Sequence, residues 1–351
     1  MKMTAIDGRV FCGAPAGVAR YCRDMILEAA KANPNREYVI FAPSLLAYDD
    51  WPENIRTQII GHSVGRFVKP IVWLKLMGAR IAKEKPDRFF ACSVYIPFGL
   101  SPKTSVVSIV HDFNHRLVPG TMARGNRWAA MMFFDRDLRK ASSIIANSRG
   151  TADKLLKFNG LHANAIINPT VPKGLIGSST PNVLKRDKLH APYLLAVSTI
   201  EPRKNIPALI AAFVSSTRMQ SLGFKLILVG KNGWGPNTNI PLDNPNVVFT
   251  GYIDDQRLSA LYSGATAYYM PSLYEGFGMP AREAIAHGCP VVCSDIPELR
   301  ESSLGKGVYI PPTIEAIRQS MDNEIWLTFP VPQFDFYSFR EHEAKFLKER
   351  V

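Results

Sequence analysis

The chain has 351 residues, of which 46% are hydrophobic and 21% charged, and its formal net charge is +12. This length exceeds what one hydrophobic core usually organises and favours two domains, and the composition excludes a disordered or fibrous protein. The longest apolar runs fall far short of the ~20 residues that span a bilayer, and the first residues lack the apolar stretch of a secretory signal. We therefore expect a cytoplasmic protein without a transmembrane helix.

The charge is unevenly distributed along the chain. Residues 1–190 contain 28 Lys and Arg against 14 Asp and Glu, whereas residues 191–351 contain 14 against 16. A basic half attracts nucleic acid, an anionic membrane or a phosphorylated substrate, and charge alone does not distinguish them. The five cysteines include no Cys-x-x-Cys pair, which predicts reduced thiols rather than disulfides or a zinc site.

Short β-rich runs alternate with helix-like segments along the chain, a pattern typical of α/β proteins with parallel sheets. The predicted strands are Lys2–Ile6, Tyr38–Ala42, Ser105–Val110, Ser143–Ala146, Tyr193–Val197, Phe224–Val229, Val247–Thr250, Ala267–Met270 and Pro290–Cys293. The predicted helices are 17–32, 126–141, 149–159, 206–216, 255–263 and 280–288.

The alternation stops between residues 170 and 190, where Pro, Gly, Ser and basic residues predominate, and a new strand begins at Tyr193. We therefore predict a first domain over 1–175, a linker over 176–190 and a second domain over 191–335. Residues 336–351 follow two prolines and predict a terminal helix that packs back toward the first domain.

The segment from Met270 to Pro290 predicts a buried strand, a glycine-containing loop and a helix with Pro280 in its first turn. Glu275 precedes this helix, and we expect Glu283 in its first turn. The amides of such a loop can bind an anion, and the two carboxylates can accept hydrogen bonds from sugar hydroxyls. The alternative is a carboxylate that only stabilises the helix dipole.

The spacing E-G-F-G-x-P-x-x-E, from Glu275 to Glu283, resembles the signature of glycosyltransferase family 4. Further segments that resemble this family follow in its order over almost the whole chain: Ile6–Arg9, Gly17–Tyr21, His111–Asp112, Ile144–Ser148 and Ser198–Asn205. The resemblance implies an α/β GT-B fold, in which two Rossmann-like domains with parallel sheets face each other across a cleft. It also implies a retaining, metal-independent glycosyltransferase that needs no cofactor and binds a nucleotide-sugar donor.

The resemblance also implies roles for individual residues. Arg203 and Lys204 neutralise the donor diphosphate, for which a guanidinium fork and an ammonium are suited. Glu283 binds the ribose, Glu275 holds the donor sugar, and His111 faces the reaction centre. The implied catalytic residues are His111, Glu275 and Lys204. The implied donor-binding residues are Gly17, Arg203, Lys204, Tyr252, Ile253, Glu275, Gly276, Phe277, Gly278 and Glu283.

Three of these assignments depend on the backbone. The loop at Gly17 approaches the phosphates or the sugar because a residue without Cβ allows close contact. The backbone near Tyr252 and Ile253 meets the base. Many members of the family have an Arg in the phosphate loop where this chain has Ser198. The resemblance therefore implies that Arg203 supplies the positive charge of that Arg.

Two spacings superficially suggest a metal site. His111 and His115 are four residues apart, but they follow a strand, so the geometry of two ligands on one helix face is not expected. Asp135 and Asp137 lie within a predicted helix rich in Arg, which indicates a salt-bridged surface. We therefore predict no metal site.

The segments HDFNH and EPRKN resemble bacterial polysaccharide mannosyl- and rhamnosyltransferases. This implies transfer of a hexose from a GDP-mannose-like donor to a growing glycan or a lipid-linked glycan. A non-catalytic nucleotide-sugar-binding subunit and a nucleotide-sugar epimerase of the same fold remain alternatives. No nucleic-acid-binding module is recognisable, so we expect no nucleic acid partner.

Two stretches, 64–88 and 124–140, combine basic with large apolar residues. Such stretches can lie on an anionic membrane surface, which predicts peripheral attachment to the inner face of the plasma membrane. The alternative is that these apolar residues belong to an ordinary core.

Overall fold

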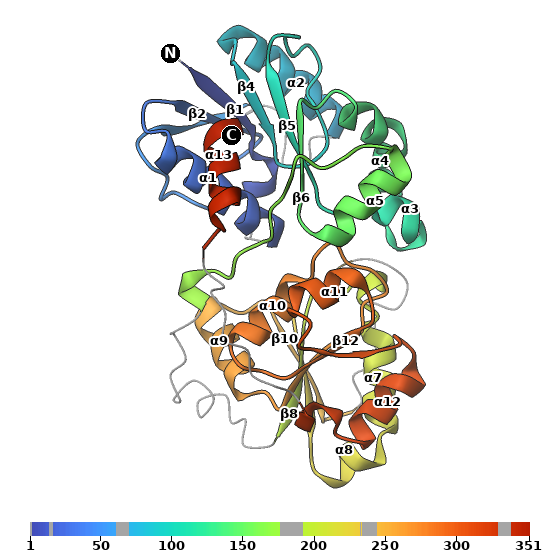
Figure 1. Cartoon of the computed structure of the whole chain (residues 1–351). Coiled ribbons are helices and arrows are strands. Elements are labelled where there is room, and N and C mark those ends of the chain that lie inside the picture. Colours follow the sequence, from blue (N-terminus) through green and yellow to red (C-terminus); the bar gives the residue numbers. More distant parts are fainter. Residues whose placement is uncertain are drawn as a thin grey trace. The chain divides into compact units, whose positions relative to one another are not determined.

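The computed structural model describes residues 2–13, 17–60, 70–175, 192–231, 233, 244–328 and 338–351. The chain divides into two compact units, coloured along the sequence in Figure 1. The first unit consists of Met1–His111, Gly125–Thr170 and Phe339–Val351, and the second of Asp112–Arg124 and Val171–Ser338. The chain therefore passes from one unit to the other four times. The predicted linker 176–190 lies outside the described residues.

The first unit contains a parallel sheet of seven strands in the order β3-β2-β1-β4-β5-β6-β7. Its strands are β1 (Met3–Asp7), β2 (Glu37–Ala42), β3 (Ile55–Ile59), β4 (Arg88–Ala91), β5 (Ser105–Val110), β6 (Ser143–Ala146) and β7 (Ala165–Ile166). Its helices are α1 (Gly17–Ala32), α2 (Pro70–Glu84), α4 (Arg124–Leu138), α5 (Arg149–Asn159) and α13 (Glu341–Arg350), with the 3-10 turn η1 (Gly8–Phe11). The strand order reverses between β1 and β4, which is the arrangement of a doubly wound sheet.

Helices cover both faces of this sheet. On one face, alternate strand residues such as Ile6 and Ile40 pack against α1 and against Leu347 of α13. On the other face, Val39 and its neighbours pack against Trp73 of α2. Burial on both faces explains why most strands of this sheet are apolar runs rather than alternating patterns.

The second unit contains a parallel sheet of six strands in the order β10-β9-β8-β11-β12-β13. Its strands are β8 (Tyr193–Val197), β9 (Lys225–Val229), β10 (Val247–Gly251), β11 (Ala267–Met270), β12 (Val291–Ser294) and β13 (Val308–Ile310). Its α-helices are α3 (Asn114–Leu117), α7 (Ile206–Ser215), α8 (Thr217–Ser221), α9 (Asp255–Gly264), α10 (Met279–Ala286), α11 (Pro297–Ser302) and α12 (Ile314–Asp322). Its 3-10 turns are η2 (Pro119–Thr121), η3 (Lys173–Leu175), η4 (Pro202–Lys204) and η5 (Ile325–Thr328).

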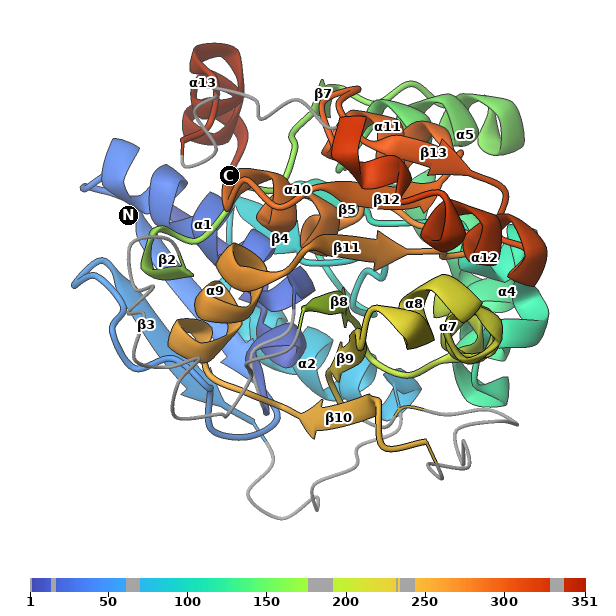
Figure 2. The ribbon, with the colours of Figure 1, turned by 90° about the horizontal axis from the view of Figure 1, so that it is seen from below.

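This sheet is also covered on both faces. Leu195 and Tyr268 pack against α9, α10 and α11, whereas Leu194 and Tyr269 pack against α7, α8 and α12. Figure 2 shows α9 and α7 on opposite sides of β8. The strand order reverses between β8 and β11, so the second sheet is doubly wound as well.

The predicted α/β class with parallel sheets is confirmed. The nine predicted strands and six predicted helices all form, most of them with ends that differ by no more than two residues. The strands and α-helices not predicted are β3, β4, β7, β13, α2, α3, α8, α11 and α12. The predicted terminal helix is α13, and its unit is the first one.

Candidate active site

The reversal point of the second sheet brings oppositely charged side chains together. The loop after β8 contains η4 with Arg203 and Lys204, and the loop after β11 contains Glu275. Because β8 and β11 are parallel neighbours, with Leu194 opposite Ala267, both loops leave the same edge of the sheet. Doubly wound sheets bind their ligands at this position.

Glu275 is paired with both cations. Its Oε2 accepts a hydrogen bond from Arg203 Nη1 at 2.6 Å, and its Oε1 accepts one from Lys204 Nζ at 2.7 Å. The residue is only 4% exposed. Burial alone would raise the pKa of this carboxyl, but Arg203 and Lys204 outweigh burial and hold the pKa at about 2. Glu275 is therefore fully ionised near neutral pH.

Arg203 has further partners in the same two loops. Its Nη2 donates to Glu201 Oε1 at 2.6 Å, and its Nη1 also donates to the carbonyl oxygen of Tyr274 at 2.8 Å. The backbone N–H of Leu273 donates to the carbonyl oxygen of Arg203 at 2.8 Å. Burial opposes the charged form, but Glu275 and Glu201 raise the pKa of the Arg203 guanidinium. Sequence reasoning missed Glu201.

The contact with Glu275 stabilises the charged form of the buried Lys204 side chain. Burial lowers the pKa of the Lys204 ammonium, and the contact with Glu275 offsets only part of this effect. A ligand with more negative charge than one carboxylate is a better counter-ion for two buried cations. The chemistry of this site therefore suits a diphosphate.

The loop between Glu275 and α10 requires glycine. Gly278 precedes the helix with φ 96°, and a Cβ at this position would lie 2.4 Å from Leu299 Cδ2. Gly278 has no side chain that could accept hydrogen bonds from the first amides of α10. These N–H groups and the positive end of the helix dipole are suited to an anionic ligand. Pro280 lies in the first turn, as predicted.

The prediction that Glu283 lies in the first turn of this helix is wrong. Because α10 begins at Met279, Glu283 lies in the second turn, where its carboxylate is too far from the helix end to stabilise the dipole strongly. It is 7% exposed and accepts a hydrogen bond from Tyr262 Oη at 3.0 Å. Burial, with the nearby Glu283 carboxylate, raises the pKa of Tyr262 well above its usual value. A carboxylate has two oxygens that accept hydrogen bonds, including those from ligand hydroxyls.

The loop after β9 was not recognised from the sequence. Gly230, with φ 140°, brings it against the loop after β8, since a Cβ at Gly230 would lie 1.9 Å from the carbonyl oxygen of Ser198. The next residue, Lys231, places its Nζ 5.0 Å from the ring centroid of Tyr252, which is 53% exposed. Ile253 lies in the core. A Val-Gly-Lys sequence at the end of a strand was the available signal.

Two of the predicted residues, His111 and Gly17, lie in the first unit. His111 follows β5, and its Nε2 lies 2.8 Å from the carbonyl oxygen of Cys92, which follows β4. Its ring packs edge to face against Tyr21, with centroids 5.9 Å apart. Gly17 is the first residue of α1, and residues 14–16 lie outside the described residues. The roles of His111 and Gly17 at the donor stay predictions.

The reversal point of the first sheet contains a second buried ion pair. Asp7, at the end of β1, is 1% exposed and pairs with Arg9 at 2.6 Å. Trp73 Nε1 donates to Asp7 Oδ1 at 3.2 Å. Nearby, burial tends to raise the pKa of the Cys22 thiol, but Cys92 and His111 outweigh it and lower the pKa to about 6.

Within the described ranges, no group of three or more His, Cys, Asp and Glu side chains is arranged to hold a metal ion. The expected surface position of Asp137 is wrong, because this residue is fully buried. It accepts hydrogen bonds from the N–H of Ile96 at 3.1 Å and from Arg136 Nε at 2.8 Å. Phe134 and Leu138 of the same helix are buried as well, and internal donors satisfy the carboxylate of Asp137. Asp135 accepts a hydrogen bond from Asn159 Nδ2 at 2.7 Å.

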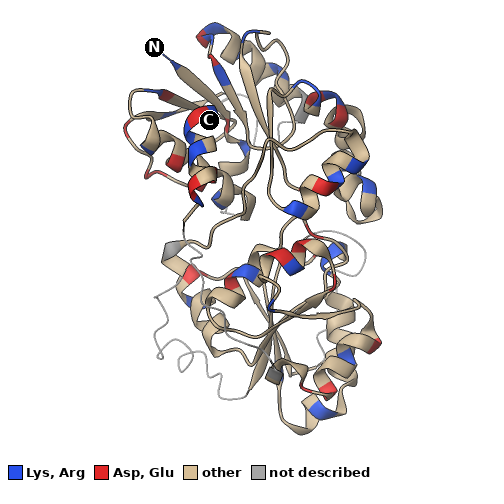
Figure 3. Cartoon of the chain, in the orientation of Figure 1, with Lys and Arg blue, Asp and Glu red and all other residues tan. Residues whose placement is uncertain are grey.

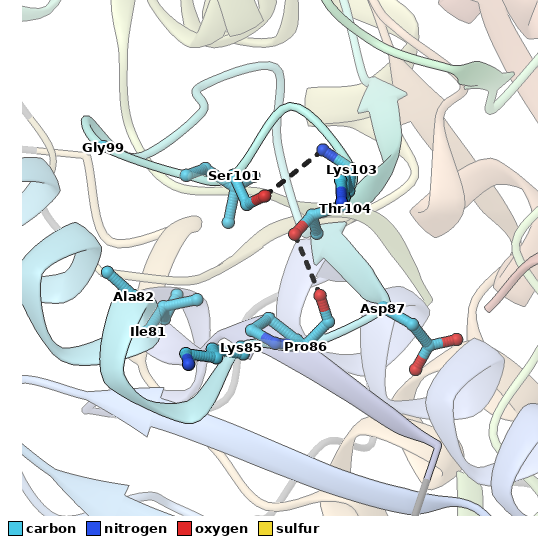
Figure 4. Close-up of a pocket in the computed structure, with 10 residues that line it drawn as sticks. Ile81, Ala82, Lys85, Pro86, Asp87, Gly99, Ser101, Lys103 and Thr104 are labelled. Carbon is cyan, nitrogen blue, oxygen red and sulfur yellow. Dashed lines mark hydrogen bonds between the residues drawn. The ribbon is translucent and has the colours of Figure 1, made fainter.

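A surface cavity of about 470 Å³ lies at the opposite edge of the first sheet (Figure 4). It is lined by residues such as Lys85, Asp87 and Lys103, which precede β4 and β5 rather than follow them. Within it, Thr104 Oγ1 donates to the carbonyl oxygen of Pro86 at 2.9 Å. Because ligands of doubly wound sheets bind at the carboxyl edge, we assign this cavity no part in the active site.

Known proteins are similar to this chain in sequence and in fold. The model of the group 1 glycosyl transferases matches residues 191–323. The O-antigen chain mannosyltransferase RfbU of Salmonella typhimurium is 30% identical over 300 residues, which cover 80% of each chain. The O-antigen chain mannosyltransferase B of Escherichia coli is 35% identical over 144 residues, 38% of each chain. This chain spans only about a quarter to two fifths of the length of the first curated relatives that it matches.

The structure of HepE from Anabaena in complex with UDP-glucose superposes with a TM-score of 0.65 at 19% identity and covers 100% of this chain and 95% of its own. Two doubly wound parallel sheets, one with a basic and acidic cluster at its reversal point, define a glycosyltransferase of the GT-B class. The chain belongs to the group 1 glycosyltransferases, glycosyltransferase family 4. The family implied by the motif from Glu275 to Glu283 is thereby confirmed.

Proposed function

We propose that this protein is a retaining hexosyltransferase that moves mannose from a GDP-mannose-like donor to a growing, lipid-linked glycan. The observation that carries the proposal is the pairing of Arg203 and Lys204 with Glu275 at the β8–β11 edge. The names of the two O-antigen mannosyltransferases support mannose as the sugar and a cell-surface glycan as the product. The UDP-glucose complex of HepE supports a nucleotide-sugar donor.

In this proposal the diphosphate takes the place of Glu275 beside Arg203 and Lys204. The acceptor hydroxyl attacks the anomeric carbon while the bond from that carbon to the diphosphate breaks. A phosphate oxygen of the leaving group takes the hydroxyl proton on the same face, so the configuration is retained and no protein nucleophile is needed. The two cations and the first amides of α10 stabilise the charge that develops on the diphosphate, which is a role that a metal ion plays in other transferases.

The other roles follow from the same pose. Glu275, released from the cations, accepts hydrogen bonds from hydroxyls of the donor sugar. Glu283 holds the ribose, and the backbone near Tyr252 meets the base. His111 contributes from the first unit to the sugar and the reaction centre.

The test is transfer by the Lys204→Ala variant, with labelled GDP-mannose and a lipid-linked acceptor. We expect kcat to fall by two or more orders of magnitude, because one preorganised charge at a reaction centre contributes about 3–4 kcal/mol. Lys306→Ala is the matched control, since Lys306 is exposed in the same unit. Transfer by Lys204→Ala at a rate near that of the wild type would refute the proposal.

Two further measurements separate the alternatives. A thermal-shift screen of GDP-, UDP- and dTDP-sugars identifies the base, because the tightest ligand raises the melting temperature most. An epimerase converts the donor without consuming acceptor, and a non-catalytic subunit neither transfers nor hydrolyses it. Either result would replace the transferase assignment.

A further inference from the structure

The structure separates the two stretches that combine basic and apolar residues. In α2, the apolar residues Trp73, Leu74 and Met77 are buried in the core of the first unit. Residues 64–69 of this stretch lie outside the described residues. The described part of the stretch therefore supports the reading as ordinary core. The helix α4 behaves differently.

The helix α4 is apolar on two opposite faces. One face, with Ala130, Phe134 and Leu138, is buried. On the other face, Trp128 is 52%, Met131 69% and Met132 55% exposed. Positions i, i+3 and i+4 adjoin on a helix, so these three side chains form one apolar patch, which we call the α4 patch. A patch of large apolar residues on a folded protein indicates an interaction surface.

Trp128 is held in place by its neighbours. Its ring packs edge to face against Phe133, with centroids 6.1 Å apart, and Phe133 packs in the same way against Phe98 at 6.2 Å. The guanidinium of Arg136 lies 4.5 Å from the centroid of the Phe133 ring. The tryptophan is therefore a preorganised anchor, which loses little conformational entropy on binding.

The charge around the α4 patch is positive. Arg127, Arg139 and Lys140 are exposed, whereas Asp135 is hydrogen-bonded to Asn159. Figure 3 shows basic residues along α4 and the neighbouring helix α5. A second copy of the chain, docked symmetrically, would bring like charges together. Cations beside Trp and Met match an anionic bilayer instead, because Trp prefers the interface and Met adapts to the acyl chains.

We propose that the α4 patch of Trp128, Met131 and Met132 docks on an anionic lipid bilayer. The cations beside the patch bind lipid phosphates, and the three apolar side chains enter the region between headgroups and acyl chains. No helix of the described part of the chain is long and apolar enough to cross a membrane. This inference goes beyond the transfer reaction and is independent of the sugar donor.

The test is flotation of the full chain with vesicles of phosphatidylcholine containing phosphatidylglycerol, at low salt. We expect wild-type protein to float with these vesicles and not with phosphatidylcholine alone. The variant W128S/M131S/M132S should lose flotation, and R127E/R139E should bind at least about 30-fold more weakly, since each cation near an anionic surface contributes about fivefold. The matched control V72S/K75E changes exposed residues of α2 and should float like the wild type.

Direct insertion is measured with brominated lipids. They should quench part of the tryptophan fluorescence of the wild type, and Trp128→Phe should abolish that part. Mannosyl transfer to a water-soluble acceptor should be equal in wild type and triple variant, which separates docking from catalysis. Failure of the wild type to float, or flotation by the triple variant, would overturn the proposal. A wild-type dimer that the triple variant converts to monomer would overturn it as well.

Discussion

Replacement of Glu275 by Gln keeps the size of the side chain and removes the charge that faces two buried cations. In the structure, Glu275 is the one side chain of the described residues that hydrogen-bonds Lys204. The pKa of its carboxyl is about 2 instead of 4.5, which corresponds to about 3 kcal/mol of interaction in favour of the charged form. This value agrees with the cost of about 3–5 kcal/mol for breaking a buried ion pair. We therefore expect Glu275→Gln to lower the free energy of unfolding by about 3 kcal/mol.

The assays are urea unfolding, which gives the free energy of unfolding, and thermal unfolding of both proteins with and without GDP. For a unit of this size the melting temperature should fall by about 6–12 °C. Because GDP supplies a diphosphate in place of the missing carboxylate, it should raise the melting temperature more in the variant than in the wild type. Transfer should nevertheless be lost, since Glu275 is assigned to the donor sugar.

The matched control is Glu315→Gln, which removes an exposed carboxylate paired with Arg318 on α12 of the same unit. Its effect on unfolding should be small, because exposed ion pairs are screened by water. The reasoning would be refuted by a Glu275→Gln protein as stable as the control variant. An equal effect of GDP on wild type and Glu275→Gln would also contradict it.

Two further predictions concern pH and backbone. The depressed pKa of Glu275 predicts a stability contribution that is present above pH 4.5 and is lost as the pH falls toward 2. The difference in urea midpoint between wild type and Glu275→Gln should therefore shrink between pH 4.5 and 3, and a constant difference would contradict this. Gly278→Ala combines a positive φ with a clash against a leucine of α11, so we expect a loss of about 2–4 kcal/mol in urea unfolding. Gly251→Ala, with φ 69° and no atom within 4 Å of the added Cβ, isolates the backbone term and should cost less than Gly278→Ala; an equal cost would contradict the clash.

The features that could be predicted from the sequence are those in which residue chemistry and local pattern indicate the same structure. The loop from Glu275 to Gly278 combines glycines, carboxylate and a proline at the start of a helix, and the structure forms that loop between β11 and α10. Apart from β10, the predicted strands are largely apolar runs buried on both faces. The strand β3 was missed because only its first residue is buried and polar residues follow, as expected at the edge of a sheet.

Other features depend on tertiary structure and leave no local signal. Glu201 is two residues from Arg203, a spacing common in any loop, and becomes significant only through its 2.6 Å contact. Asp137 lies in an Arg-rich stretch that looks like surface, but its helix position turns it inward to the N–H of Ile96. The exposure of Trp128 could not be predicted either, because an apolar residue in a helix is usually core.

The segment Asp112–Arg124 matters for any exchange of parts between related transferases. In sequence it lies between β5 and α4 of the first unit, but it belongs to the second, where the N–H of Phe113 donates to Tyr274 Oη at 3.0 Å. A chimera joined near residue 171 would therefore combine the loop after β11 of one parent with a Phe113 segment from the other. We expect such hybrids to keep donor preference only when both segments come from the same parent. An exchange of the second unit should therefore transfer both of its segments, Asp112–Arg124 and Val171–Ser338.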